Sequence, residues 1–152
     1  MSQIDPRAPR FGQAITAALS LGAVLLQEPA LVYVVATLLL VPVLSSWQID
    51  PYGFLWKRVA RSFVGSPKTT ESPLPHRFAR VVGAGLTGSA AILFIVATAA
   101  DLASASILAY GLTTVVGLLA ALGATTGFCL GCRMYRQVAF VRDLGVLSSP
   151  SE

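Results

Sequence analysis

Four long apolar runs without a charged residue limit what this chain can fold into. They cover residues 11–27, 30–47, 81–100 and 102–132. A helix needs about 20 apolar residues to cross the hydrocarbon core of a bilayer, whereas a soluble helix keeps a polar face. Only 12% of the residues are charged, against about 25% in soluble domains. We therefore predict an all-α, four-transmembrane-helix bundle with spans at about 11–27, 30–47, 78–100 and 103–130.

The basic residues all lie on one side of this four-span path. They precede the first run, separate the second from the third and follow the fourth, whereas each of the other two connections contains one charged residue, Glu28 or Asp101. Cytoplasmic loops of membrane proteins are enriched in Lys and Arg. We therefore expect a multi-pass protein of the plasma (inner) membrane with both termini in the cytoplasm. The net charge of +4 then reflects topology rather than binding of nucleic acid.

The chain reads as a pseudo-two-fold repeat of a two-helix unit, with halves at about 7–64 and 74–144. Setting Arg10-Phe11 over Arg77-Phe78 aligns the first and third spans without gaps. The second and fourth spans then end in matched motifs, Asp50-Pro51-Tyr52-Gly53 over Cys129-Leu130-Gly131-Cys132 and Trp56-Lys57 over Tyr135-Arg136. Both halves begin on the same side, so we expect the symmetry axis along the membrane normal.

Each half ends in a predicted short amphipathic helix at the cytoplasmic surface of the lipid bilayer, at about 54–63 and 133–144, where basic and apolar residues alternate. Within a single integral membrane domain, 1–152, residues 65–76 are expected to form a linker and 145–152 a disordered tail.

In the fourth span, Gly123, Gly127 and Gly131 recur every four residues. They predict one smooth helical stripe that lets a neighbouring helix approach closely.

The two cysteines, Cys129 and Cys132, stand where the last apolar run gives way to Arg133 and Arg136. A Cys-x-x-Cys pair serves thiol–disulfide chemistry or metal binding. A thiol at a helix C-terminus faces the negative end of the dipole, which raises its pKa. A helix break at Gly131 would instead put Cys132 at a helix N-terminus, where the dipole and both arginines favour the thiolate. The sequence leaves both geometries open.

Cys129 and Cys132 are the candidate catalytic thiol pair, and the repeat places Asp50 and Tyr52 at the same depth as a candidate pocket wall. The cytoplasm is reducing, so a cycling pair fits better than a permanent structural disulfide. No cofactor is expected. The alternative is a zinc ion on Cys129, Cys132 and His76, although a closed zinc site has four ligands. Otherwise His76 is a solvated residue of the linker.

Several motifs together carry a family resemblance: Asp5-Pro6-Arg7, Pro9-Arg10-Phe11, Asp50-Pro51-Tyr52-Gly53, Arg77-Phe78-Ala79 and Gly127-Phe128-Cys129-Leu130-Gly131-Cys132. They cover nearly the whole chain, which resembles a bacterial family of small four-span membrane proteins that is frequent in actinobacteria and is catalogued as a domain of unknown function. In that family a proline usually stands at the position of His76. The resemblance implies the four-span topology and the importance of the cysteines, and it hints at thioredoxin-like or sulfur-transfer partners.

The leading hypothesis is thiol redox or sulfur handling by Cys129 and Cys132 at the cytoplasmic face, with a soluble thioredoxin- or rhodanese-like partner. One alternative is a non-enzymatic scaffold or accessory subunit, which would form a homo-oligomer or join a larger membrane complex through the glycine stripe. Another is a small-solute transporter with its path along the symmetry axis. The span cores contain no ionisable side chain, which argues against an ion pump or a proton relay.

Overall fold

The computed structural model describes residues 4–66 and 69–147, with side chains described as far as residue 142. In chain order the helices are α1 (Arg7–Leu26), α2 (Pro29–Leu44), α3 (Pro51–Leu55), the π-helical turn η1 (Trp56–Ala60), α4 (Arg61–Val64), α5 (Leu74–Ala100), α6 (Ala103–Thr126) and α7 (Leu130–Leu147). Within the described ranges no strand forms beyond an isolated bridge between Ile4 and Glu71. The prediction of an all-α fold is confirmed.

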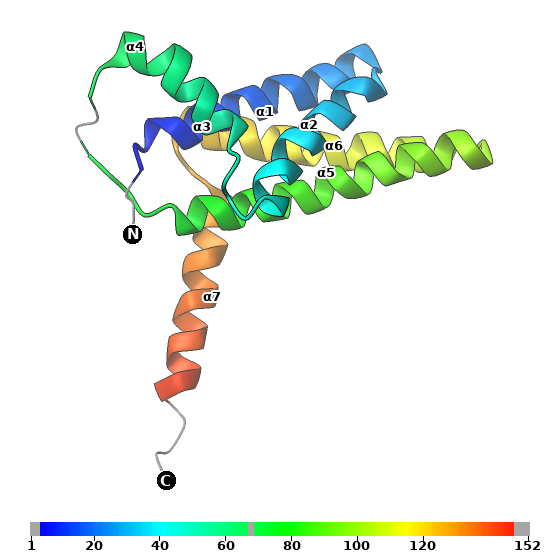
Figure 1. The fold of residues 1–152 in the computed structure, drawn as a ribbon. Helices are drawn as coiled ribbons and strands as arrows, with labels where there is room; N and C mark the ends of the chain where they lie inside the picture. Colours follow the sequence, from blue (N-terminus) through cyan, green and yellow to red (C-terminus); the bar gives the residue numbers. More distant parts are fainter. Residues whose placement is uncertain (1–3, 67–68, 148–152) are drawn as a thin grey trace.

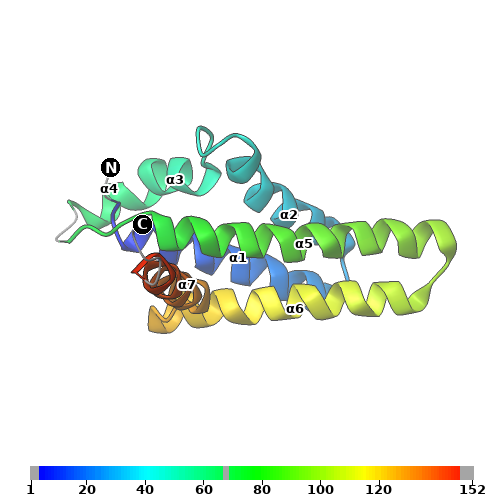
Figure 2. The same ribbon diagram turned by 90° about the horizontal axis from the view of Figure 1, so that it is seen from below.

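Four helices, α1, α2, α5 and α6, lie side by side as an elongated bundle, and α7 leaves one end of it at a steep angle (Figure 1). The two short turns of the bundle, at residues 27–28 and 101–102, lie toward the other end (Figure 2). Gln27 and Asp101 end their helices with left-handed φ values of 54° and 51°. Across the bundle, α1 packs mainly against α6, and α2 packs mainly against α5.

Three of these helices, α1, α5 and α6, are long and apolar enough to cross a membrane. The fourth, α2, is apolar but has 16 residues, which span about 24 Å at 1.5 Å per residue. Large apolar side chains such as Ile92, Ile107 and Leu118 point out of the bundle and are more than half exposed. Extended apolar outer faces are typical of a surface that contacts lipid.

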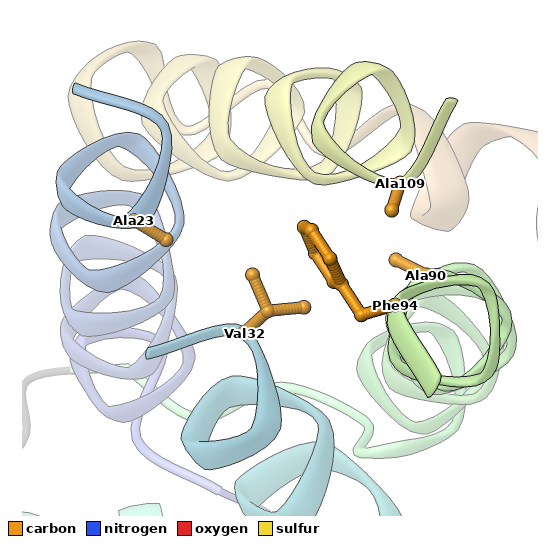
Figure 3. Packing of buried hydrophobic residues seen from close by; sticks show 5 residues of the cluster. All are labelled: Ala23, Val32, Ala90, Phe94 and Ala109. Atoms are coloured by element: carbon orange, nitrogen blue, oxygen red, sulfur yellow. The ribbon is translucent and has the colours of Figure 1, made fainter. Parts of the chain in front are cut away.

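Near the two short turns, the core of the bundle packs around Phe94 of α5. Ala90 of the same helix and small or branched side chains from the other three helices, Ala23, Val32 and Ala109, form one buried cluster with it (Figure 3). Alanine at these positions lets helix backbones come close, and close packing is the main source of helix association in lipid.

Helix α6 ends earlier than the expected fourth span, and this difference shapes the site. Gly127 takes a φ of 70° and closes the helix at Thr126 rather than at residue 130. The prediction of a single glycine stripe on one helix is therefore wrong. Gly123 lies on α6, Gly127 lies in the break, and Gly131 lies on α7.

Other boundaries shift by a few residues. α2 ends at Leu44, two residues after Pro42, rather than at 47. α5 begins at Leu74, inside the segment expected as a linker, and α7 continues to Leu147, inside the expected tail. Residues 148–152 of that tail lie outside the described residues.

Candidate functional site

The site is built at the break between α6 and α7. After Gly127, the chain turns back and α7 begins at Leu130, so Cys129 occupies the position just before the helix. The Arg133 N–H donates to the Cys129 carbonyl over 3.1 Å, and the Cys132 N–H donates to Cys129 Sγ over 3.3 Å. Cys129 therefore caps α7 with its sulfur, and Cys132 follows one turn later.

This geometry decides between the two alternatives left open by the sequence. The break falls at Gly127 rather than Gly131, so Cys129 takes the capping position before α7, and Cys132 lies inside its first turn. The positive end of a helix dipole favours a thiolate at that position. The Arg133 guanidinium lies over the Phe128 ring, 5.1 Å from its centre, and the lowered pKa of Cys129 comes from hydrogen bonds rather than from an arginine.

The two free thiols have divergent acidities. Hydrogen bonding from the Cys132 thiol lowers the pKa of Cys129 to about 6, although burial acts in the opposite direction. Backbone N–H groups at the start of α7 and the Gln13 side chain also hydrogen bond to Cys129 and lower its pKa. The hydrogen bond to Cys129, together with burial, raises the pKa of Cys132. The pair thus combines a nucleophilic thiolate with a thiol that holds its proton.

His76 lies beside the thiols rather than in a solvated linker. It belongs to the first turn of α5 and its Nδ1 atom is 3.6 Å from Cys132 Sγ. Its Nε2 atom is 3.6 Å from a carboxylate oxygen of Glu71. Two backbone hydrogen bonds with Ile4, of 3.0 and 2.9 Å, hold the Glu71 backbone next to the start of the chain. The segment before α5 therefore contributes a side chain to the site.

Of the two residues predicted to form the pocket wall, Tyr52 lines the same cavity as Cys129 and Asp50 does not. Tyr52 lines a cavity of about 150 Å³ at the end of the bundle, together with Cys129, His76 and Gln13. Its hydroxyl shares a 2.7 Å hydrogen bond with Thr16, and burial raises the pKa of the Tyr52 phenol. Tyr52 is therefore a neutral member of the cavity wall.

Asp50 does not line this cavity but a larger depression beside it. It occupies the position before α3 and forms a 2.8 Å ion pair with Arg80. The Arg80 guanidinium also lies 5.3 Å from the centre of the Tyr52 ring, so it links the two candidate wall residues.

Three polar residues of the cavity were not singled out from the sequence as site residues: Gln13, Thr16 and Arg80. Gln13 and Thr16 are the first polar side chains of an otherwise apolar run on α1. Their position at the start of that run is the signal that could have marked them.

Among the described residues, Cys129, Cys132 and His76 are the group that could hold a metal ion, with ligand atoms within 4.8 Å of one another.

The fold and the site together define an all-helical protein with three helices suited to a membrane and a thiol pair at the start of α7. The chain belongs to the family described as Domain of unknown function (DUF4395), whose model matches residues 4–139. No curated protein and no solved structure matches the chain.

The lowered pKa of Cys129 predicts how the rate of its alkylation depends on pH. In reduced, chelator-treated protein, alkylation of Cys129 by iodoacetamide should reach half its maximal rate near pH 6. Cys132→Ala removes the main hydrogen-bond donor and should move this midpoint up toward the ordinary thiol value of about 8.5. Mass spectrometry of the alkylated peptide measures both. Equal midpoints in the two proteins would contradict the assignment of the donor.

Proposed function

We propose that this is a four-span protein whose reduced Cys129–Cys132 pair exchanges disulfides with a soluble dithiol protein at the cytoplasmic face of the plasma membrane. The observation that carries the proposal is the cap of α7. Cys129 accepts hydrogen bonds from the backbone and thiol of Cys132, and it lines a cavity. A thiolate nucleophile with a second thiol within reach is the arrangement that disulfide exchange needs.

The four-span topology draws support from the ends of the bundle. The starts of α1 and α5 lie at the end where α4 and α7 leave it, and the short turns lie toward the other (Figure 2). The turns carry Glu28 and Asp101, and the segments at the first end carry the arginines. The positive-inside rule then puts both termini and the cysteines in the cytoplasm, with α2 as the shortest crossing.

The aromatic contacts support the parallel repeat. The Phe11 ring lies 5.6 Å from the Trp56 ring, and the Phe78 ring lies 5.8 Å from the Tyr135 ring. In the alignment of the halves, Phe11 matches Phe78 and Trp56 matches Tyr135. In each half, an aromatic residue near the N-terminus of the first helix, α1 or α5, thus packs against an aromatic residue of the segment that ends the half, η1 or α7.

The residues that precede α3 and α7 also support the parallel repeat of the two halves. Asp50 and Cys129 are matched in the alignment, and each accepts a backbone hydrogen bond from the residue four positions later. Asp50 receives the Arg80 side chain from α5, and Cys129 receives the Gln13 side chain from α1. Gln13 and Arg80 are also matched positions. The thiol site is therefore the counterpart of a charged contact in the other half.

The proposed reaction is a two-step exchange. The Cys129 thiolate attacks one sulfur of the partner's disulfide, forms a mixed disulfide and releases the partner's other sulfur as a thiolate. Cys132 then loses its proton to solvent and attacks Cys129 Sγ, which forms the Cys129–Cys132 disulfide and releases the second partner thiolate. Two electrons pass to the partner, which takes up two protons. A dithiol partner drives the same steps in reverse.

The proposal is tested with purified protein in detergent. Reduced wild-type protein should release two equivalents of thionitrobenzoate from dithiobis-nitrobenzoate and end with a Cys129–Cys132 disulfide. Reduced thioredoxin, used as a soluble dithiol probe, should then reduce that disulfide again. If the reagent labels both cysteines and no internal disulfide forms, the pair does not exchange and the proposal fails.

A further inference from the structure

Beyond disulfide exchange, we propose that the reduced site binds one thiophilic divalent cation, of the class of Zn²⁺, through Cys129 Sγ, Cys132 Sγ and His76 Nδ1. The three atoms come from the cap of α7, its first turn and the first turn of α5. They converge from two helices that pack against each other. The proposal needs the two thiols to be reduced, but it does not depend on the exchange reaction.

The distances fit such an ion. In tetrahedral zinc sites the Zn–S distance is about 2.3 Å and the Zn–N distance is about 2.0–2.1 Å, which puts sulfur and nitrogen ligands about 3.6 Å apart. His76 Nδ1 and Cys132 Sγ are 3.6 Å apart. All three ligand atoms lie within 4.8 Å of one another.

Glu71 favours the His76 tautomer that leaves Nδ1 free to bind a metal. Its carboxylate lies 3.6 Å from His76 Nε2 and favours the proton on that atom. Nδ1, which faces Cys132, is then left with its lone pair free for a metal. A carboxylate behind a ligating histidine typically adds about 10–100-fold to metal affinity. Two backbone hydrogen bonds to Ile4 hold the Glu71 backbone in place, so the contact between Glu71 and His76 is part of the fold.

The ligand set leaves one coordination position open. Three protein ligands plus water is the arrangement of open zinc sites, and thiolate and imidazole suit zinc better than magnesium or calcium. An occupied site holds both sulfurs, so it blocks disulfide formation. The metal-loaded form is therefore a protected reduced state of the same pair.

The test uses Co²⁺ and Zn²⁺ with the full chain in detergent, reduced and freed of metal with a chelator. Wild-type protein should bind about one equivalent of Co²⁺ with a thiolate-to-metal charge-transfer band, and Zn²⁺ should displace it. His76→Asn should weaken Zn²⁺ binding at least tenfold, and Glu71→Gln, on an exposed carboxylate, about tenfold. Glu28→Gln, in a turn at the other end of the bundle, is the matched control and should change nothing.

Two outcomes would overturn this inference: no binding by protein with both thiols reduced, or binding that depends on the cysteines and not on His76 or Glu71. Neither outcome affects the exchange assay, which is run on chelator-treated protein. Conversely, intact metal binding with no internal disulfide would remove the exchange reaction and leave the metal site standing.

Discussion

Cys129→Ser protein should react with dithiobis-nitrobenzoate roughly tenfold more slowly than wild type at pH 6, and it should never release a second equivalent of thionitrobenzoate. With a pKa of about 6, half of Cys129 is thiolate at that pH. An ordinary thiol of pKa about 8.5 is only about 0.3% ionised there, and the weaker nucleophilicity of a low-pKa thiolate offsets part of this advantage.

Cys132→Ser is the matched control, because it keeps the nucleophile and removes the second thiol. It should release one equivalent and then stop at a stable mixed disulfide on Cys129. Stopped-flow absorbance gives the rates and mass spectrometry gives the adduct. If the two variants exchange roles, so that Cys129→Ser is the fast one, the assignment of the nucleophile is wrong.

The second large effect is expected at Gly131, where α7 crosses α5. A Cβ at Gly131 would lie 2.8 Å from the Cβ of Ala79 and 3.0 Å from its Cα. Gly→Ala in a helix normally stabilises by up to about 1 kcal/mol, but overpacking costs about 1–3 kcal/mol. Because the nearby Cα atom belongs to a backbone that cannot rotate away, the clash should win and Gly131→Ala should destabilise the protein.

Thermal unfolding in detergent measures this effect, since 1 kcal/mol corresponds to about 2–4 °C in a chain of this size. Gly85→Ala is the control, because a Cβ there meets nothing within 4 Å. We expect Gly131→Ala to lower Tm and Gly85→Ala to leave it unchanged or raise it. A Gly131→Ala protein as stable as the Gly85→Ala protein would show that α7 does not pack on α5 as described.

The helices could be predicted because apolar runs and the residues between them carry strong signals. The turns at Gln27 and Asp101 stand where charges or polar groups interrupt the runs. The end of α6 carried no such signal. Glycine is common inside membrane helices, so Gly127 reads as a packing residue, and only its left-handed backbone makes it a helix end. The same reason explains why the glycine stripe was wrongly predicted.

The sequence predicted the two thiols of the site, but it did not predict the residues around them or the helix break that positions them. Cys129 and Cys132 stand out by spacing, but their order of acidity follows from the capping position, which depends on the break at Gly127. His76 reads as a linker residue because the sequence places no cysteine near it. Its contact with Cys132 arises from the packing of α7 on α5. Such long-range pairings need the three-dimensional fold.

The central claim, a reactive thiol pair that faces the cytoplasm, is tested most directly by labelling with a membrane-impermeant maleimide. The chain has only two cysteines, so the reduced wild-type protein reports on the site without further changes. A cysteine-free protein with Glu28→Cys reports on the opposite face. We expect labelling of wild type in inverted membrane vesicles and not in intact cells, with the reverse for Glu28→Cys. Labelling of the native cysteines in intact cells would contradict the account.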